Sequence, residues 1–214
     1  MGKRMLGGLL LVVCLLGLGG CVFGSVDEMY ALPKSSEAYV NLQAKINEEK
    51  GTGEYIAPLN GENRQTIQLV DVDEDGLQEA VAFFRDADAD TPLRIVIFKQ
   101  DDQGEYQVYA RIQGVGSEID SIEYVNLGGA GESDVLVSWQ AGSSLRTLVG
   151  YTITDGQPTE IMRSAYDRYL TADLDGDGQE EVVLAQAEEE SSSTRIEYYD
   201  SRDGVLTLTA TSPL

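Results

Sequence analysis

Two loops of the sequence place acidic residues at alternate positions, a spacing that suits a hard cation. DVDEDGLQE runs from Asp71 to Glu79 and DLDGDGQEE from Asp173 to Glu181, so both share the spacing D-x-D-x-D-G-x-x-E. Calcium prefers oxygen ligands, and alternate Asp side chains on a tightly curled loop converge on one point when a Gly permits the turn. Crowded carboxylates repel one another unless a positive charge lies among them. We therefore expect one Ca²⁺ at each loop.

The expected ligands occupy equivalent positions in the two loops. Positions 1, 3 and 5 supply side-chain oxygens, position 7 a backbone carbonyl oxygen, and position 9 a carboxylate that completes the shell. These residues are Asp71, Asp73, Asp75, Leu77 and Glu79 in the first acidic loop, and Asp173, Asp175, Asp177, Gln179 and Glu181 in the last acidic loop. A solvated acidic turn is the alternative interpretation, and a bound ion could also serve only to brace the hairpin.

The residues that follow the two loops exclude an EF-hand. An EF-hand needs a Glu at position 12 and flanking helices, whereas position 12 is Ala82 or Leu184 and both loops lead into β-type runs. With this spacing between strands, residues 66–214 resemble the FG-GAP/VCBS repeat family. The resemblance implies calcium loops between the first two strands of β-propeller blades, as in the integrin headpiece.

The sequence around the acidic loops occurs as three units. Asp71, Asn126 and Asp173 take the same place in these units and lie about 50 residues apart, a period typical of repeat architectures. Each unit contains four strand-like runs, the pattern of a propeller blade. We expect an all-β fold, a β-propeller-like array of three four-stranded antiparallel blades with one short N-terminal helix. A β-sandwich is the alternative.

The middle unit departs from the acidic pattern. Its loop at 126–134, here the middle loop, keeps the turn glycine and the terminal acid but lacks acidic side chains at positions 3 and 5. We expect it to hold the turn without a metal. Trp139, the only tryptophan, alternates with apolar residues inside a strand, which predicts a role in packing.

The N-terminal helix is predicted from apolar spacing. Residues 36–50 place Tyr39, Leu42 and Ile46 at helical intervals, with Gly51 as a plausible C-terminal stop. The predicted segments are a signal peptide at 1–20, a lipid anchor and tether at 21–35, the helix and its connection at 36–65, and propeller repeats over 66–214, at about 66–120, 121–167 and 168–214.

The N-terminal sequence is typical of an export signal. A positive MGKR precedes an apolar run that is short and poorly flanked for a transmembrane helix. The run ends in Leu18-Gly19-Gly20-Cys21, which resembles a bacterial lipobox and implies lipid attachment to the Cys21 thiol. The membrane would then be a partner through this lipid. We expect anchoring to the outer face of the cytoplasmic membrane, or to an outer membrane where one is present. An ordinary secretory signal is the alternative.

Composition excludes several functions. The chain has 37 acidic and 15 basic residues, a formal charge of -22 and no histidine. A basic face for nucleic acid is therefore not expected, and triads or zinc sites built on histidine are absent. We expect a non-enzymatic, lipid-anchored extracellular module that binds a protein or glycan. The alternative is a carbohydrate-active enzyme or its accessory subunit at the cell surface.

Three units are fewer than the four to eight blades with which propellers typically close. We expect that the protein continues beyond Leu214 with further blades. Association of chains into a ring and an open arc of three units are the alternatives.

Overall fold

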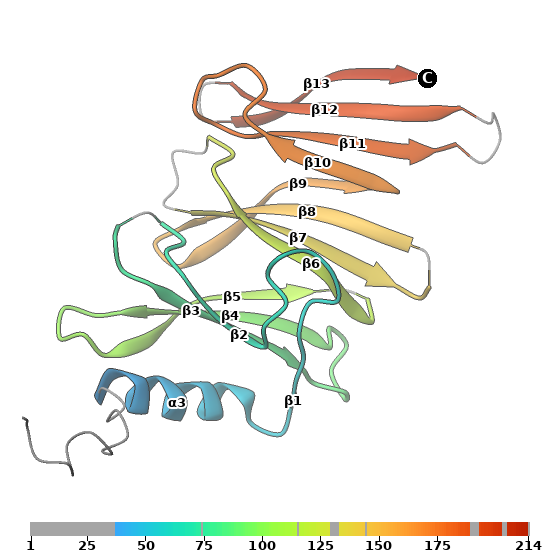
Figure 1. The fold of residues 1–214 in the computed structure, drawn as a ribbon. Helices are drawn as coiled ribbons and strands as arrows, with labels where there is room; N and C mark the ends of the chain where they lie inside the picture. Colours follow the sequence, from blue (N-terminus) through green and yellow to red (C-terminus); the bar gives the residue numbers. More distant parts are fainter. Residues whose placement is uncertain are drawn as a thin grey trace, which may run out of the picture. The chain divides into compact units, whose positions relative to one another are not determined.

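The polypeptide from Glu37 onward forms one helix followed by a series of antiparallel strands (Figure 1). This computed structural model describes residues 37–214, with the exception of 74, 115, 129–132, 144, 189–192, 203–204 and 214. The expected signal peptide, the lipid attachment at Cys21 and the tether lie outside the described residues.

Three antiparallel sheets follow one another along the sequence after helix α3 (Glu37–Lys50). The first sheet comprises β1 (Glu54–Tyr55), β2 (Ile67–Val70), β3 (Glu79–Arg85), β4 (Leu93–Gln100) and β5 (Tyr106–Gly114). The second comprises β6 (Glu118–Val125), β7 (Ser133–Ala141), β8 (Leu145–Thr154) and β9 (Gln157–Ala165). The third comprises β10 (Arg168–Ala172), β11 (Glu181–Ala187), β12 (Thr194–Arg202) and β13 (Val205–Pro213).

The second and third sheets are meanders whose strands pair in sequence order, and β2 to β5 of the first sheet pair in the same way. In the first sheet the short β1 pairs with the end of β3 at Arg85, and β2 pairs with its beginning at Glu79. The two acidic loops connect β2 to β3 and β10 to β11, while the middle loop connects β6 to β7. All three loops therefore join the first two long strands of a sheet.

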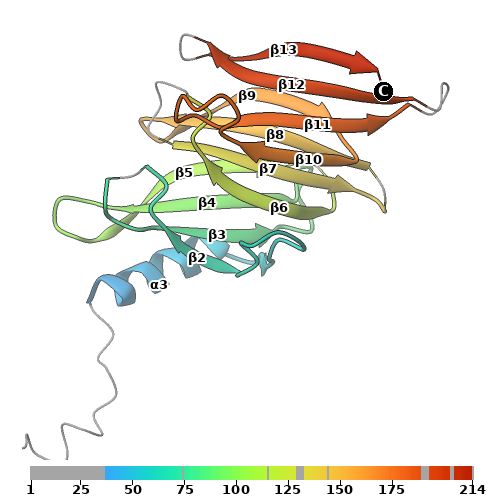
Figure 2. The same ribbon diagram turned by 45° about the horizontal axis from the view of Figure 1, so that its top comes forward.

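Helix α3 and the three sheets form successive layers (Figures 1 and 2). An apolar cluster that includes Leu42 and Phe84 joins α3 to the first sheet. A larger cluster joins the first sheet to the second, and a third cluster around Leu184 joins the second sheet to the third. Burying one large apolar side chain stabilises the fold by roughly 1.5–3 kcal/mol, so this stacking explains why the central strands are apolar on both faces.

Two details differ from the sequence predictions. Tyr39 is 47% exposed and does not join the buried face of α3, whose cluster contains Ala38, Leu42 and Ile46 at intervals of one helical turn. The boundary predicted at 120/121 falls inside β6, because this strand pairs with β7 from Glu118 onward across a register shift. An all-β fold with one short helix and antiparallel sheets is confirmed for the described residues. The propeller arrangement stays a prediction.

Candidate metal centres

The two acidic loops fold so that their carboxylates converge. Asp71, Asp73 and Glu79 each offer an oxygen within 4.8 Å of the others, and Asp173, Asp175 and Glu181 do the same. The turn glycine at position 6 has a positive φ in both loops, 88° at Gly76 and 90° at Gly178, a conformation open to glycine without steric cost. Two groups of acids that could hold a metal ion are thus present at the predicted places.

The acid at position 9 is buried and lies on the inner side of each group. Glu79 and Glu181 begin β3 and β11 and are 2% and 1% exposed. Each accepts a hydrogen bond through Oε2 from the backbone of position 2, from Val72 N at 2.8 Å and from Leu174 N at 2.6 Å. This bond fixes the carboxylate on the inner side of the loop.

The first group contains carboxylate oxygens without a partner. Glu79 Oε1 and Asp71 Oδ1 are both buried and accept no hydrogen bond in the structure. Burial raises the pKa of Glu79, and the charges of Asp73 and Asp75 raise it further against the Val72 hydrogen bond. Leaving buried acceptors unpaired costs about 1–3 kcal/mol each, and more for charged groups. The set of hard oxygen donors and these unmet acceptors fit a calcium ion.

In the last group, backbone N–H groups of the loop fix the position of the first acid. Asp173 accepts from Gly176 N at 2.6 Å through Oδ1 and from Gly178 N at 3.1 Å through Oδ2. These bonds orient the carboxylate while the loop around it stays exposed. Desolvation raises the pKa of Tyr198, and the charges of Glu181, Asp200 and Asp175 raise it further.

The acids at position 5 lie outside both groups. Asp75 Oδ1 accepts from Leu77 N at 2.8 Å, and Asp177 Oδ1 accepts from Gln179 N at 2.8 Å. Such short-range bonds compete with other uses of an Asp side chain. Ligation by positions 5 and 7 therefore stays a prediction, whereas positions 1, 3 and 9 converge in both loops.

Lys99 is a residue of the first group that sequence reasoning missed. Its Nζ forms ion pairs with Asp73 and, at 3.1 Å, with Asp75. Partial burial lowers the pKa of Lys99, but its bonds to the two carboxylates raise that pKa overall. The hydrogen bonds from Leu77 N and from Lys99 lower the pKa of Asp75. Lys99 follows Phe98, which pairs with Ala80 beside Glu79. Only the strand register brings it to the loop.

The middle loop shares the buried acid but no metal group. Asp134 accepts from Leu127 N at 2.9 Å through Oδ2, the same bond that Glu79 and Glu181 make in their loops. The acid at position 9 therefore has a structural role independent of metal. Among the residues that the structure describes, no third group of converging acids accompanies Asp134; residues 129–132 of the loop lie outside that description.

The middle loop contacts the last acidic loop. Glu180 N donates to Asn126 O at 2.6 Å, and Asn126 Nδ2 donates to Gly178 O at 3.1 Å. Gly128 has a φ of +73°, and a Cβ there would meet Gln179 Oε1 at 1.4 Å. Ser201 of β12 adds a bond to Gly128 O at 3.2 Å. The last acidic loop is thereby attached to the second sheet.

A polar interface separates the second and third sheets beside their apolar cluster. Tyr169 OH bonds Ser121 Oγ at 2.9 Å and donates to Glu123 Oε1 at 2.6 Å, while Thr171 donates to Glu123 Oε2 at 2.8 Å. Burial raises the pKa of Tyr169, and the hydrogen bond to Glu123 raises it further, against the hydrogen bond with Ser121. The carboxylate of Glu123 thus links the second sheet to the third.

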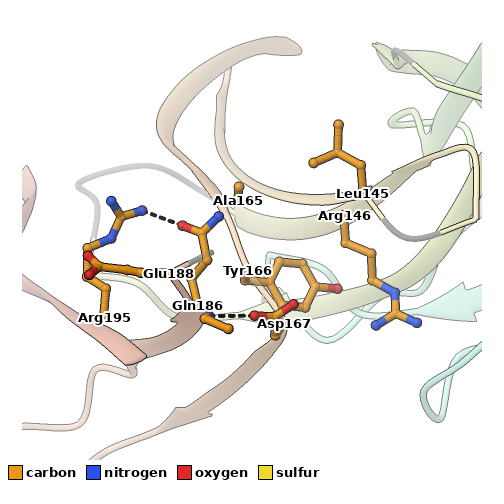
Figure 3. Close-up of a pocket in the computed structure, with 9 residues that line it drawn as sticks. Leu145, Arg146, Ala165, Tyr166, Asp167, Gln186, Glu188 and Arg195 are labelled. Atoms are coloured by element: carbon orange, nitrogen blue, oxygen red, sulfur yellow. Dashed lines mark hydrogen bonds between the residues drawn. The ribbon is translucent and has the colours of Figure 1, made fainter. Parts of the chain in front are cut away.

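A cavity of about 420 Å³ opens at the other end of these sheets (Figure 3). Its lining combines the Tyr166 ring with Arg146 and Arg195. Asp167 Oδ2 accepts from Ala187 N at 2.6 Å, and Arg195 donates to Gln186, as the dashed lines mark. Because β11 runs from Glu181 to Ala187, the cavity and the last acidic loop lie at opposite ends of this strand.

Comparisons with known proteins add little to this geometry. No protein-family model matches the sequence, and no curated protein matches it either. The chain is similar to a solved structure described as "Structure of a Xanthomonas Type IV Secretion System related protein", with a TM-score of 0.36 and 12% identity over 72% of this chain. It spans 63% of that protein's length. A likeness this distant carries no argument.

The described residues contain no helix with the length and apolar character needed to cross a membrane.

Proposed function

We propose that this protein is an extracellular, lipid-anchored module of the FG-GAP/VCBS type, in which calcium braces propeller-like sheets that bind a protein or glycan. The observation that carries the proposal is the convergence of three carboxylates in each acidic loop, with the buried Glu79 left short of a partner. Hard oxygen donors around an exposed loop suit Ca²⁺ better than the softer transition metals. Asp71, Asp73 and Glu79 would hold one ion, and Asp173, Asp175 and Glu181 the other.

The braced loops support a structural role for calcium. Each loop lies between two strands of a sheet, and the last acidic loop also bonds to the middle loop through Asn126. An ion at this place would tie β10 to β11 and hold their junction against the second sheet. The cation would add charge neutralisation, and the chain itself would supply the ligands and their orientation.

The hydrogen bonds and ion pairs of three carboxylates outside the acidic loops favour a binding role over catalysis. Glu123 and Asp167 accept hydrogen bonds from Tyr169 and from Ala187 N, and Asp120 is ion-paired with Arg146 at 3.3 Å. These three acids already serve contacts within the protein, which favours a structural role for them over that of an acid–base pair on a sugar. The cavity that Asp167 lines also presents the Tyr166 ring, Arg146 and Arg195, which suit a glycan or peptide that carries carboxylates.

Retention and turnover on a polysaccharide panel test this function. We expect the protein to be retained on one or more acidic polysaccharides without releasing products, and Arg195→Ala to weaken retention while Arg202→Ala, on the same strand, does not. A carboxylate substitution outside both acidic loops that abolishes a measured turnover would instead establish the enzyme alternative. Retention by no polysaccharide, together with binding of a purified surface protein, would assign a protein ligand.

Lipid attachment at Cys21 is a separate expectation of the same proposal. Two acyl chains give stable anchoring at about 0.8 kcal/mol per buried methylene, whereas one chain holds marginally. Mass spectrometry of protein from the membrane fraction is expected to show a chain that begins at a diacylated Cys21, and Cys21→Ser is expected to release the protein. An unmodified Cys21 in that fraction contradicts the anchor.

A further inference from the structure

We propose that Lys99 is a built-in counter-cation of the first acidic loop, so that the two loops bind calcium unequally. The last acidic loop would be the high-affinity site. The first would accept an ion only when the Lys99 ammonium group leaves Asp73. The inference rests on the proposed calcium function and extends it, because it assigns different affinities to two loops whose motifs are alike.

The position of Lys99 in the first loop is the primary observation. Its Nζ is shared between Asp73 and Asp75, and the side chain of Asp73 is only 7% exposed. The same ammonium lies 5.8 Å from the centroid of the Tyr109 ring. A metal bound by Asp73 would meet this positive charge at close range, and like charges at such distances repel by several kcal/mol where solvent screening is weak.

The lysine does not complete the site. Glu79 Oε1 and Asp71 Oδ1 stay without a hydrogen-bond partner although both are buried, and Glu79 is 2% exposed. Lys99 therefore neutralises Asp73 of the group and the neighbouring Asp75, and it leaves one oxygen each of Asp71 and Glu79 unsatisfied. This arrangement keeps a binding site for a divalent ion while lowering the gain from filling it.

The equivalent position differs in every sheet. In the first sheet, Lys99 directly follows Phe98, which pairs with Ala80. In the third sheet, Asp200 directly follows Tyr199, which pairs with Val182. In the second sheet the position is Thr152, which pairs with Asp134. Ala80 and Val182 each follow the position-9 acid, so the neighbouring strand presents an ammonium group to the first loop and a carboxylate to the last.

The charge difference sets the expected order of affinity. The Asp200 carboxylate beside the last loop is paired with Arg202 at 3.3 Å, so β12 brings no net positive charge to that loop. The first loop has lost one unit of negative charge to Lys99. Calcium affinity of loop sites is tuned by ligand charge and rigidity, so the last loop should fill first.

An ordinary surface ion pair is the alternative account of Lys99. Such pairs contribute little to stability and would not alter a neighbouring site strongly. The two accounts differ in the response of the lysine variant to calcium, because a tethered competitor lowers calcium affinity whereas an incidental pair does not.

The test is calorimetric titration of Ca²⁺ into the full chain in detergent, for the wild type, Lys99→Met and Lys45→Met. Lys45 lies on α3 and its substitution removes the same charge away from both loops. The wild type is expected to show a tight and a weak step. Lys99→Met should tighten the weak step by about tenfold or more, and Lys45→Met should leave it unchanged. Asp71→Ala and Asp173→Ala assign the steps to loops.

Thermal unfolding supplies a second readout. Without calcium, Lys99→Met should melt below the wild type, because Asp73 and Asp75 lose their counter-charge; at saturating calcium the order should reverse. Two equal steps in the wild type that Lys99→Met leaves unchanged would overturn the inference while the calcium function stands. Calcium binding in neither protein would overturn both.

Discussion

Calcium at a hundred times the dissociation constant of the last acidic loop is expected to stabilise the folded protein by about 2.7 kcal/mol. The reason is mass action, since the converging carboxylates of Asp173, Asp175 and Glu181 exist only in the folded chain. An isolated stretch of the unfolded chain would bind the ion weakly. Urea unfolding with and without calcium measures the difference in the free energy of unfolding.

Glu181→Gln is the variant that tests this stabilisation. The substitution keeps the shape of a side chain that is 1% exposed and keeps an acceptor for Leu174 N, while it removes the negative charge. We expect the calcium-dependent gain to fall to the contribution of the first loop. Glu48→Gln, on the exposed side of α3, loses the same charge and should retain the full gain. A full gain in Glu181→Gln would exclude the last loop as the site.

Trp139→Ala is expected to destabilise the protein by about 3–5 kcal/mol, the cost of removing a large buried aromatic group and leaving a cavity. Trp139 is 2% exposed and belongs to the cluster between the first and second sheets. Its ring lies against Gly114 so closely that a Cβ there would meet ring carbon Cζ3 at 2.0 Å. The indole therefore fills the space that the glycine of β5 leaves.

Denaturant unfolding of Trp139→Ala and Trp139→Phe measures this packing. Phe keeps most of the ring contacts, so its cost should be well below that of Ala. Calcium stoichiometry should be unchanged in Trp139→Phe, because the ring packs on Gly114, whose partner Leu93 pairs with the Arg85 end of β3, and the first acidic loop meets β3 at its other end. A loss below 1 kcal/mol in Trp139→Ala would mean that the two sheets are not held by this cluster.

Much of this protein could be predicted from local sequence. The strands IQLV, EAVAFF and LRIVIF lie where the apolar runs predict them, because a run of β-branched and aromatic residues between turn residues favours a strand whatever its partner. The acidic loops are equally local. The acids from Asp71 to Glu79 lie on one short segment, so their spacing predicts convergence. Positions 1, 3 and 9 of the five predicted positions converge.

Contacts between strands decided what local sequence left open. Lys99 and Asp200 lie far along the chain from the acids they accompany, and the register of β3 with β4 and of β11 with β12 brings them there. Likewise Tyr39 shares the helical spacing of Leu42 but stays exposed, because the first sheet covers only the face of α3 that carries Ala38 and Ile46. The sequence by itself determined the sheets and two acidic loops of one type. Tertiary structure decided that the surroundings of these loops differ in charge, because the neighbouring strand places Lys99 beside the first loop and Asp200 beside the last.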